Sequence, residues 1–307
     1  MIQEEKHIQK GIFLGLNAYL IWGLLPIYWK FLETTRAEIV LGHRIIWSFI
    51  FMLIFILITN KTRVFIEECK KVWKNKKTLL TITIASMIIS VNWLIFIWAV
   101  QTDRVVQASL GYYINPLMSV LLGVFVLKER LSRAQLLSVI LAGIGVTYLT
   151  FSYGVFPWIS LALAISFAVY GLLKKLVAVN STFSLALVTM VIAPFTLILL
   201  VYSEGWDLGF SEITLDTGIL LSLTGVATAI PLLLFGASVR PLSLSMAGFL
   251  KYIAPTIMLV LGGFLYEEDF TTAHLITFVL IWVSLIIFMT TSVLQNRRRI
   301  ISRSKMM

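Results

Sequence analysis

Two stretches of this sequence, 139 positions apart, repeat each other without a gap. Residues 92–130 align with residues 231–269, and 11 of the 39 aligned positions are identical. Shared apolar composition alone would give roughly 10 % identity, so the informative matches are those of rarer residue types. These include Tyr113/Tyr252, Pro116/Pro255, Gly123/Gly262 and Glu129/Glu268. The repeat predicts a chain built twice from one unit, which restricts the fold more than any other feature.

The chain as a whole is strongly apolar. Of the 307 residues, 59 % are hydrophobic and only 13 % are charged, and the mean hydropathy is +0.94. A soluble domain of this length needs more polar surface, so the composition indicates an integral membrane protein. The apolar runs are close to 20 residues long, which matches helices crossing a hydrocarbon layer about 30 Å thick. Alternating ten-residue strands are absent, which excludes a membrane β-barrel.

Ten apolar runs predict ten membrane-spanning helices and no soluble domain. Their links are short, and the longest of them, 60–77 and 204–216, are polar. The predicted spans are 11–31, 38–59, 78–100, 105–127, 134–151, 155–173, 183–203, 217–239, 244–265 and 273–294.

The basic residues are distributed very unequally between the two sides of such a bundle. With alternating sides, 20 of the 25 lysines and arginines fall on the side of the two termini. Two fall on the other side and three lie within spans. Positively charged loops stay cytoplasmic, so we expect a multi-pass membrane protein with both termini in the cytoplasm. The net charge of +10 is then a topological signal and not a sign of nucleic-acid binding.

Five spans in each half would make the second copy enter the membrane from the opposite side. In that arrangement Lys128-Glu129-Arg130 faces the cytoplasm and its counterpart Glu267-Glu268-Asp269 faces outward. The outward copy lacks basic residues, as an inverted pair requires. We therefore expect an all-α fold of two inverted five-helix repeats, at 1–151 and 152–294, followed by a basic tail at 295–307.

Arg44 is the deepest basic residue of the first half. It lies six residues into the second predicted span, which is about 9 Å along the helix axis. One interpretation is that Arg44 orients an anionic or carboxylate group in the outer half of a cavity. The other is structural, with Arg44 pairing with Glu38 or capping the carbonyls of a broken helix. The sequence leaves both open.

A polar stripe marks the fourth span. Gln107, Gly111, Asn115 and Ser119 recur every four residues and share one helix face. Such a face meets either a cavity or another helix, because lipid offers its polar groups no partner. We expect the cavity, and a polar clamp between helices is the alternative.

Lys251 is the most informative residue of the second half. It follows Leu250 within the ninth span, beside Tyr252 and four residues before Pro255, and no acidic residue lies deep within a span to pair with it, since Glu38 and Asp103 are near the outer ends. A membrane lysine without a fixed counter-ion can meet an anionic substrate. We expect Lys251 to contact substrate or to gate the pathway.

The candidate site is completed by aromatic and amide side chains, and by prolines that interrupt helices and permit bending. The predicted substrate-binding residues are Trp22, Arg44, Asn92, Trp93, Tyr112, Asn115, Lys251 and Tyr252, and the predicted helix-bending residues are Pro26, Pro116, Pro231 and Pro255.

Several sequence blocks resemble a known family. They are HRIIWS (43–48), NWLIFIWAV (92–100), ASLGYYINPL (108–117), KER (128–130) and GFLKYIAPT (248–256). Together they resemble the RarD subfamily of EamA-type transporters, within the drug/metabolite transporter superfamily. The resemblance implies a ten-span inner-membrane carrier with a central cavity between two inverted repeats. Members of that superfamily move amino acids, small metabolites, nucleotide sugars or drugs. Lys251 stands where the subfamily often has a neutral amide.

The sequence is compatible with different classes of function to different degrees. The expected function is a secondary transporter, exporter or exchanger, that works by alternating access on small metabolites, amino acids or drugs. A passive facilitator or channel is the alternative. An intramembrane enzyme is not expected, because the spans contain no paired Asp, Ser/His or metal-ligand cluster, and no cofactor motif is present. The expected partners are a small-molecule substrate and membrane lipids, with no nucleic acid and with a homodimer left open.

Overall fold

The computed structural model is built of helices throughout the residues that it describes. These are residues 2–128, 132–154, 156–177, 179, 183–210, 213–238, 242 and 250–304. The helices of the first half are α1 (Ile2–Lys30), α2 (Ala37–Ile58), α3 (Thr62–Lys74), α4 (Lys76–Gln101), α5 (Val105–Leu127) and α6 (Arg133–Tyr153). Those of the second half are α7 (Trp158–Leu176), α8 (Ser184–Glu204), α9 (Leu215–Ser238), α11 (Ile253–Val260), the π-helix η2 (Leu261–Leu265) and α12 (Thr272–Ser304).

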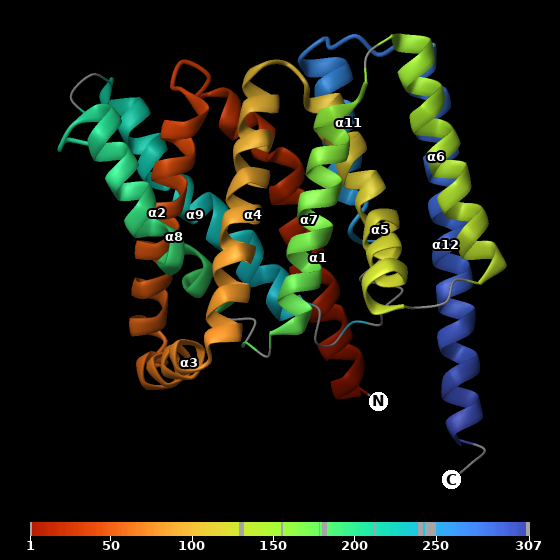
Figure 1. The fold of residues 1–307 in the computed structure, drawn as a ribbon, viewed down its shortest axis with the longest axis horizontal. Helices are drawn as coiled ribbons and strands as arrows, with labels where there is room; N and C mark the ends of the chain where they lie inside the picture. Colours follow the sequence, from red (N-terminus) through yellow and green to blue (C-terminus); the bar gives the residue numbers. More distant parts are fainter. Residues whose placement is uncertain are drawn as a thin grey trace.

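The predicted all-helical membrane architecture is confirmed. Within the described residues, nine helices are long and apolar enough to cross a membrane, and Ile253–Leu265 is a shorter apolar segment. The long helices run side by side, and the first residues of α1 and the end of α12 lie at the same end of the bundle (Figure 1). Of the predicted ninth span, residues 244–249 lie outside the described residues. The remainder starts as a turn at Lys251 and Tyr252 before α11 begins.

One link differs from expectation. The polar stretch 60–77 was predicted to be a loop, but Thr62–Lys74 forms the helix α3. This helix lies across the ends of the spans, where Figure 1 shows it nearly end-on. Phe65 and Val72 are seven residues apart, hence on one face, and both are buried. The helical spacing of its few apolar residues is hard to recognise in the sequence because most of the surrounding residues are charged.

The first helix of each half packs against helices of the other half. The first helix of the second half, α7, packs on α4 and α5, and the first helix of the first half, α1, packs on α9 and α11. If the five spans of each half are matched in order, these two sets of neighbours are equivalent. The pairs α2–α8, α5–α11 and α6–α12 join equivalent helices. This is the contact pattern that a two-fold relation between inverted halves produces.

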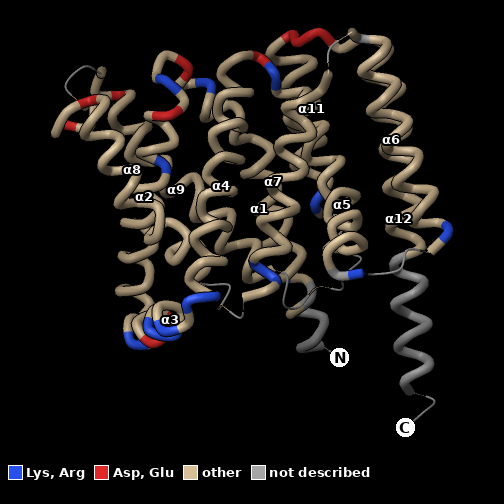
Figure 2. Tube along the Cα trace, viewed as in Figure 1, with Lys and Arg blue, Asp and Glu red and all other residues tan. Residues whose placement is uncertain are grey.

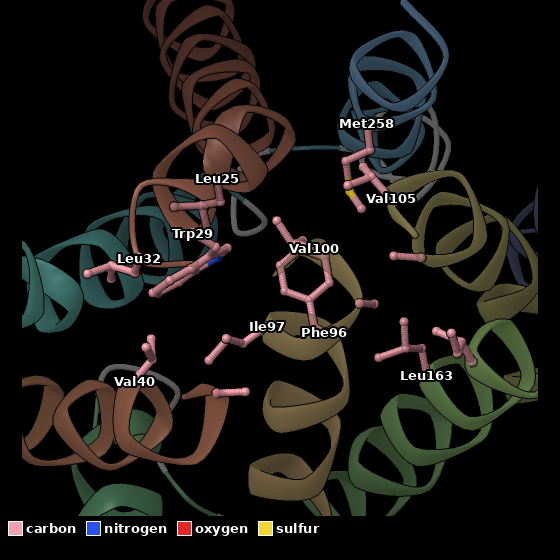
Figure 3. Packing of buried hydrophobic residues seen from close by; sticks show 14 of the residues in the cluster. Leu25, Trp29, Leu32, Val40, Phe96, Ile97, Val100, Val105, Leu163 and Met258 are labelled. Atoms are coloured by element: carbon pink, nitrogen blue, oxygen red, sulfur yellow. The ribbon is translucent and has the colours of Figure 1, made fainter. Parts of the chain in front are cut away.

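The largest part of the core lies where these helices of the two halves meet (Figure 3). Apolar residues from both halves share this cluster, so the halves are packed together rather than merely adjacent. Among its fully or nearly fully buried members are Leu25 and Trp29 of α1, Val40 of α2, Phe96 and Ile97 of α4, Val105 of α5, Leu163 of α7 and Met258 of α11.

Local signals fix where several helices begin and end. The Asn75 side chain accepts hydrogen bonds from the backbone N–H groups of Lys77 and Thr78, at 3.1 and 3.2 Å, and so caps the start of α4. Ser132 and Gln135 form a reciprocal capping box at the start of α6. Gly154 ends α6 in the left-handed conformation, with φ of 73°.

Candidate functional site

Arg44 is buried inside the helix bundle. It lies on α2 with only 6 % of its surface exposed. The adjacent His43 points elsewhere, and its Nε2 lies 3.0 Å from the carbonyl oxygen of Leu208. Side chains at adjacent helical positions diverge by about 100°, so the two residues face different surroundings.

Two tryptophans hold the guanidinium of Arg44. Its Cζ lies 4.9 Å from the ring centroid of Trp29 on α1 and 4.3 Å from that of Trp93 on α4. Both rings are buried. Cation–π contacts of this kind contribute up to about 2 kcal/mol each when they are desolvated, and they offset part of the cost of burying the charge.

The hydrogen-bonding groups around Arg44 are incompletely satisfied. Its Nε and Nη1 atoms are buried and have no hydrogen-bond partner among the described residues. The same is true of Trp29 Nε1 and of Ser48 Oγ, which lies one helical turn after Arg44 on α2. Leaving buried donors unpaired costs about 1–3 kcal/mol each, more for charged groups. We refer to Arg44, Trp29, Trp93 and Ser48 as the Arg44 group.

The structural alternative of an Arg44–Glu38 pair is not observed. The Glu38 carboxylate lies 3.1 Å from Nε of Arg36, at the end of the bundle, and Arg36 also contacts Glu204 at 3.2 Å. No hydrogen bond from Nε or Nη1 of Arg44 to a helix carbonyl is present in the described part of the chain. The sequence alone does not predict the cation–π contacts of Arg44 with Trp29 and Trp93.

Two tyrosines extend the Arg44 group. The phenol groups of Tyr28 and Tyr112 lie within electrostatic reach of the guanidinium. The Tyr28 hydroxyl donates a hydrogen bond to the carbonyl of Leu220 on α9. The Tyr112 ring makes edge contacts with Phe96 and Phe167, at centroid distances of 5.8 and 6.4 Å. Of the predicted site residues, Trp93 and Tyr112 therefore lie near Arg44.

The two predicted asparagines hold helices together in this conformation. Nδ2 of Asn92 donates to the carbonyl of Leu163 and to the hydroxyl of Ser166, at 3.1 and 2.8 Å. Nδ2 of Asn115 donates to the carbonyl of Ala164 at 3.1 Å. All three acceptors belong to α7. The Oδ1 atom of Asn92 is buried without a partner, and a role of either amide in substrate binding stays a prediction.

Two further positions of the polar stripe, Gln107 and Gly111, also face α7. The Ser160 hydroxyl donates to the carbonyl of Gln107 at 2.6 Å. A Cβ atom placed on Gly111 would lie 2.8 Å from the carbonyl oxygen of Ser160, so the two backbones are in close contact there. Ser119 is exposed and donates only to the carbonyl of Asn115, within its own helix. In this conformation the stripe forms the helix–helix clamp that was the alternative interpretation.

Lys251 and Tyr252 lie at the interruption before α11. Lys251 is exposed, and within the described residues no ion pair, hydrogen bond or ring contact joins it to the Arg44 group. The Tyr252 ring stacks on that of Tyr113, at a centroid distance of 5.9 Å. A substrate role for Lys251 and Tyr252 stays a prediction.

Trp22 and the four prolines occupy helical positions. The Trp22 ring contacts Tyr19 and Phe235, at centroid distances of 5.2 and 5.6 Å, on the side where α1 meets α9. The prolines Pro26, Pro116 and Pro231 lie inside α1, α5 and α9, and Pro255 is in the first turn of α11. A proline in a first turn removes no helical hydrogen bond, whereas the other three each do. Their role in bending stays a prediction.

A second partly buried charge links the halves at the end of the bundle opposite α3. The Glu268 carboxylate accepts hydrogen bonds from the backbone N–H groups of Val105 and Val106, at 2.5 and 2.8 Å, at the start of α5. Burial raises the pKa of Glu268, and the two N–H groups oppose that rise. Glu268 thus caps a helix of the first half from the second half.

Three members of the Arg44 group or its surroundings were missed by sequence reasoning. They are Tyr28, Trp29 and Ser48. A usable signal was present for Ser48, which lies four residues after Arg44 and therefore on the same helix face. Tyr28 and Trp29 precede Lys30 near the end of the first span, where aromatic residues usually indicate the membrane interface. Among the described residues, no three His, Cys, Asp or Glu side chains lie together as a metal site would require.

Comparison with known proteins supports these observations. Residues 9–151 match the model of the EamA-like transporter family. The chain is 43 % identical to "Uncharacterized transporter YojE" of Bacillus subtilis (strain 168) over 294 residues, which cover 96 % of this chain and 98 % of that protein. It is 37 % identical to "Protein RarD" of Salmonella typhi, over 96 % of this chain and all of that protein.

A solved structure shares the fold. A crystal structure of a protein only 14 % identical in sequence superposes with a TM-score of 0.59 and covers 91 % of this chain and 97 % of its own. The chain is a multi-pass membrane protein that belongs to the EamA-like transporter family, and within it to the RarD type.

Proposed function

We propose that this protein is a secondary transporter that moves a small metabolite, amino acid or drug across the cytoplasmic membrane by alternating access. Its two halves, 1–151 and 152–294, would rock against each other around the Arg44 group, and 295–307 would form a basic tail. Export or exchange is the proposed direction. A passive facilitator is the second candidate, because the fold alone does not require coupling to a second solute.

The observation that carries the proposal is Arg44, a buried cation with no ion pair among the described residues, located where helices of the two halves pack together. Arg44 and its two tryptophans join α1, α2 and α4, and α1 itself packs on α9 and α11 of the other half. A relative movement of the halves would therefore change the surroundings of Arg44. Ionisable residues inside membrane bundles commonly line such pathways.

The charge distribution supports an orientation with both termini in the cytoplasm. Figure 2 shows lysines and arginines concentrated at the end of the bundle that carries α3, while most acidic residues lie at the opposite end. Basic segments resist translocation, so the α3 end would face the cytoplasm of a bacterial inner membrane.

Counterflow in liposomes tests the proposal. Liposomes containing the purified protein are loaded with one unlabelled solute at millimolar concentration and diluted into the same radiolabelled solute, across a panel of amino acids and aromatic metabolites. A carrier gives a transient overshoot of label for its substrate, and protein-free liposomes give none. Downhill equilibration of a solute without overshoot would identify a facilitator instead. Absence of flux for every solute, from protein shown to be folded, would contradict the transporter proposal for these substrate classes.

A further inference from the structure

We propose that the Arg44 group binds the carboxylate of an organic monoanion with an apolar or aromatic body. The proposal rests on the transporter function above and names the chemical class of its substrate.

The first step is that no acidic side chain pairs with Arg44 in the part of the chain that the structure describes. Three acidic residues pair elsewhere: Glu38 pairs with Arg36, and Glu33 and Asp103 pair with Lys30, both at 2.7 Å. No ion pair to Arg44 occurs within the described residues. A guanidinium stays charged in a protein, so its charge must be balanced by rings, dipoles or a bound anion.

The second step concerns what kind of atom is missing. Four buried atoms of the Arg44 group lack a partner: Arg44 Nε, Arg44 Nη1, Trp29 Nε1 and Ser48 Oγ. Guanidinium and indole nitrogens can only donate hydrogen bonds, and a hydroxyl can donate as well. These four buried atoms therefore lack hydrogen-bond acceptors. A cluster of unpaired donors around a cation fits an anion with several acceptor oxygens.

The third step selects a carboxylate with an apolar body. One guanidinium balances one negative charge, which favours a monoanion over a doubly charged phosphate. Its planar donors match the planar carboxylate. The surrounding surface is aromatic, because Trp29, Trp93 and Tyr112 lie around the guanidinium and Phe96 contacts Tyr112. These rings favour an apolar or aromatic remainder of the ligand.

Matched acid and amide ligands test this inference by binding alone. The probes are phenylacetate with phenylacetamide, and indole-3-acetate with indole-3-acetamide, titrated into detergent-solubilised protein while the unfolding midpoint is recorded. Each pair has nearly the same shape, and only the acid carries a charge. We expect at least one acid to stabilise the protein with an affinity at least tenfold higher than that of its amide.

Variants of Arg44 then show whether this residue causes the preference for the acid over the amide. Arg44→Gln should abolish the preference for the acid, and Arg44→Lys should retain part of it. Arg104→Gln is the matched control, because Arg104 also stacks on a tryptophan, with its Cζ 5.0 Å from the ring of Trp98, at a more exposed position. Arg104→Gln should keep the full preference. Equal binding of acid and amide by the wild-type protein would overturn the inference, even if Arg44→Gln failed to fold. So would a preference that survives in folded Arg44→Gln.

Two further results distinguish the carboxylate inference from an inorganic anion site and from the transporter proposal. If sodium chloride alone gave an Arg44-dependent stabilisation as large as the acids do, the group would be an inorganic anion site and the carboxylate proposal would be overturned. If the acids bound through Arg44 but no solute showed counterflow or flux, the ligand class would stand and the transporter proposal would fail. If only neutral or cationic solutes showed counterflow, the transporter proposal would stand and the carboxylate inference would be overturned.

An independent observation concerns α3. We also infer that α3 is a docking surface for the headgroups of anionic phospholipids at the cytoplasmic face. The inner side of α3, with Phe65 and Val72, is buried against the spans. Beside it, Ile66 and Trp73 lie on one face and expose 47 % and 61 % of their surfaces.

Basic residues flank this exposed apolar face. Arg63, Lys70 and Lys74 project about 40–80° from Ile66 by helical geometry, and all three are exposed. Arg63 pairs with Glu67 at 3.4 Å, while no ion pair to Lys70 or Lys74 occurs within the described residues. An apolar edge with tryptophan beside lysines is the pattern of a helix lying in the membrane interface. Lysines near the membrane surface are attracted to anionic headgroups.

Nanodiscs of defined composition test the α3 inference with the full-length protein. Replacing part of the phosphatidylcholine by phosphatidylglycerol should raise the unfolding midpoint of the wild-type protein. The double variant Lys70→Gln/Lys74→Gln should lose at least half of that rise. The double variant Lys10→Gln/Arg133→Gln removes the same charge from exposed positions outside α3 and should keep it. Equal responses of the two variants would overturn the inference, and so would an equal effect of inorganic phosphate in pure phosphatidylcholine.

Discussion

Tyr113 and Tyr252 stack on each other, with ring centroids 5.9 Å apart and planes inclined by 11°. They are also equivalent residues of the internal repeat, separated by 139 positions. A residue meets its own equivalent only where it lies next to a two-fold axis. The contact therefore supports the proposed division into two inverted halves, whose axis would lie between α5 and the start of α11.

Close contact of α5 with α7 predicts a strong effect of substituting Gly111. Gly111→Ala would place a methyl group 2.8 Å from the Ser160 carbonyl oxygen, which belongs to rigid backbone. We expect a loss of about 1–3 kcal/mol in the free energy of unfolding, measured by thermal or denaturant unfolding in detergent. Gly143→Ala is the control, because nothing lies within 4 Å of its Cβ position and alanine favours the helix. An equal loss in both variants would contradict the packing described here.

The Asn115 amide should contribute to the same helix contact. Asn115→Ala removes its hydrogen bond to the Ala164 carbonyl on α7. Hydrogen bonds between membrane helices contribute about 0.5–1.5 kcal/mol, so we expect a destabilisation of that size in unfolding experiments. Ser119→Ala, on the same stripe but exposed, should change stability little. A substrate role would show separately, as a loss of probe affinity larger than the loss of stability explains.

Glu268 gives a prediction with a defined pH dependence. Glu268→Ala leaves the N–H groups of Val105 and Val106 without their acceptor, and we expect a loss of about 1–2 kcal/mol. Glu268→Gln keeps one acceptor oxygen and carries no buried charge, so it should cost much less. The exposed neighbour Glu267 provides the control variant Glu267→Ala, for which we expect no such loss.

The sign of the pH effect follows from the raised pKa of Glu268. A carboxyl whose pKa is higher in the folded state stabilises the fold below that pKa, and this contribution is lost as the pH rises through it. The stability of the wild-type protein relative to Glu268→Gln should therefore fall as the pH rises above about 4, the ordinary pKa of a glutamate. A difference that grows in favour of the wild-type protein with rising pH would show that the two N–H groups outweigh burial.

Lys251 tests selectivity rather than stability. It is exposed and has no ion pair within the described residues, so Lys251→Gln should leave the unfolding midpoint nearly unchanged. If Lys251 contacts substrate or gates the pathway, its neutralisation should increase transport of cationic solutes relative to anionic ones. An unchanged substrate profile and rate in liposomes would contradict that role.

The sequence was sufficient to predict the membrane architecture, because long apolar runs and the bias of basic residues report directly on the bilayer. It failed at α3, where a short amphipathic helix is hidden by its charges. It left Arg44 undecided, because the tryptophans that hold Arg44 come from two other helices. The nearest of these in sequence, Trp29, is 15 positions away. Contacts between helices distant in sequence have no local signature, so the structure was needed to find the Arg44 group.

Accessibility of Ser48 from the two sides of the membrane tests the central proposal most directly. In a Cys69→Ser background, Ser48→Cys places a thiol one turn from Arg44, at a position that is fully buried in this structure. Alternating access predicts that membrane-impermeant thiol reagents modify it from either side, in right-side-out and in inside-out vesicles. Ser138→Cys, equally buried between α6 and α12, should stay unreactive. Modification of Ser48→Cys from one side only, or from neither, would contradict a site that opens alternately to both sides.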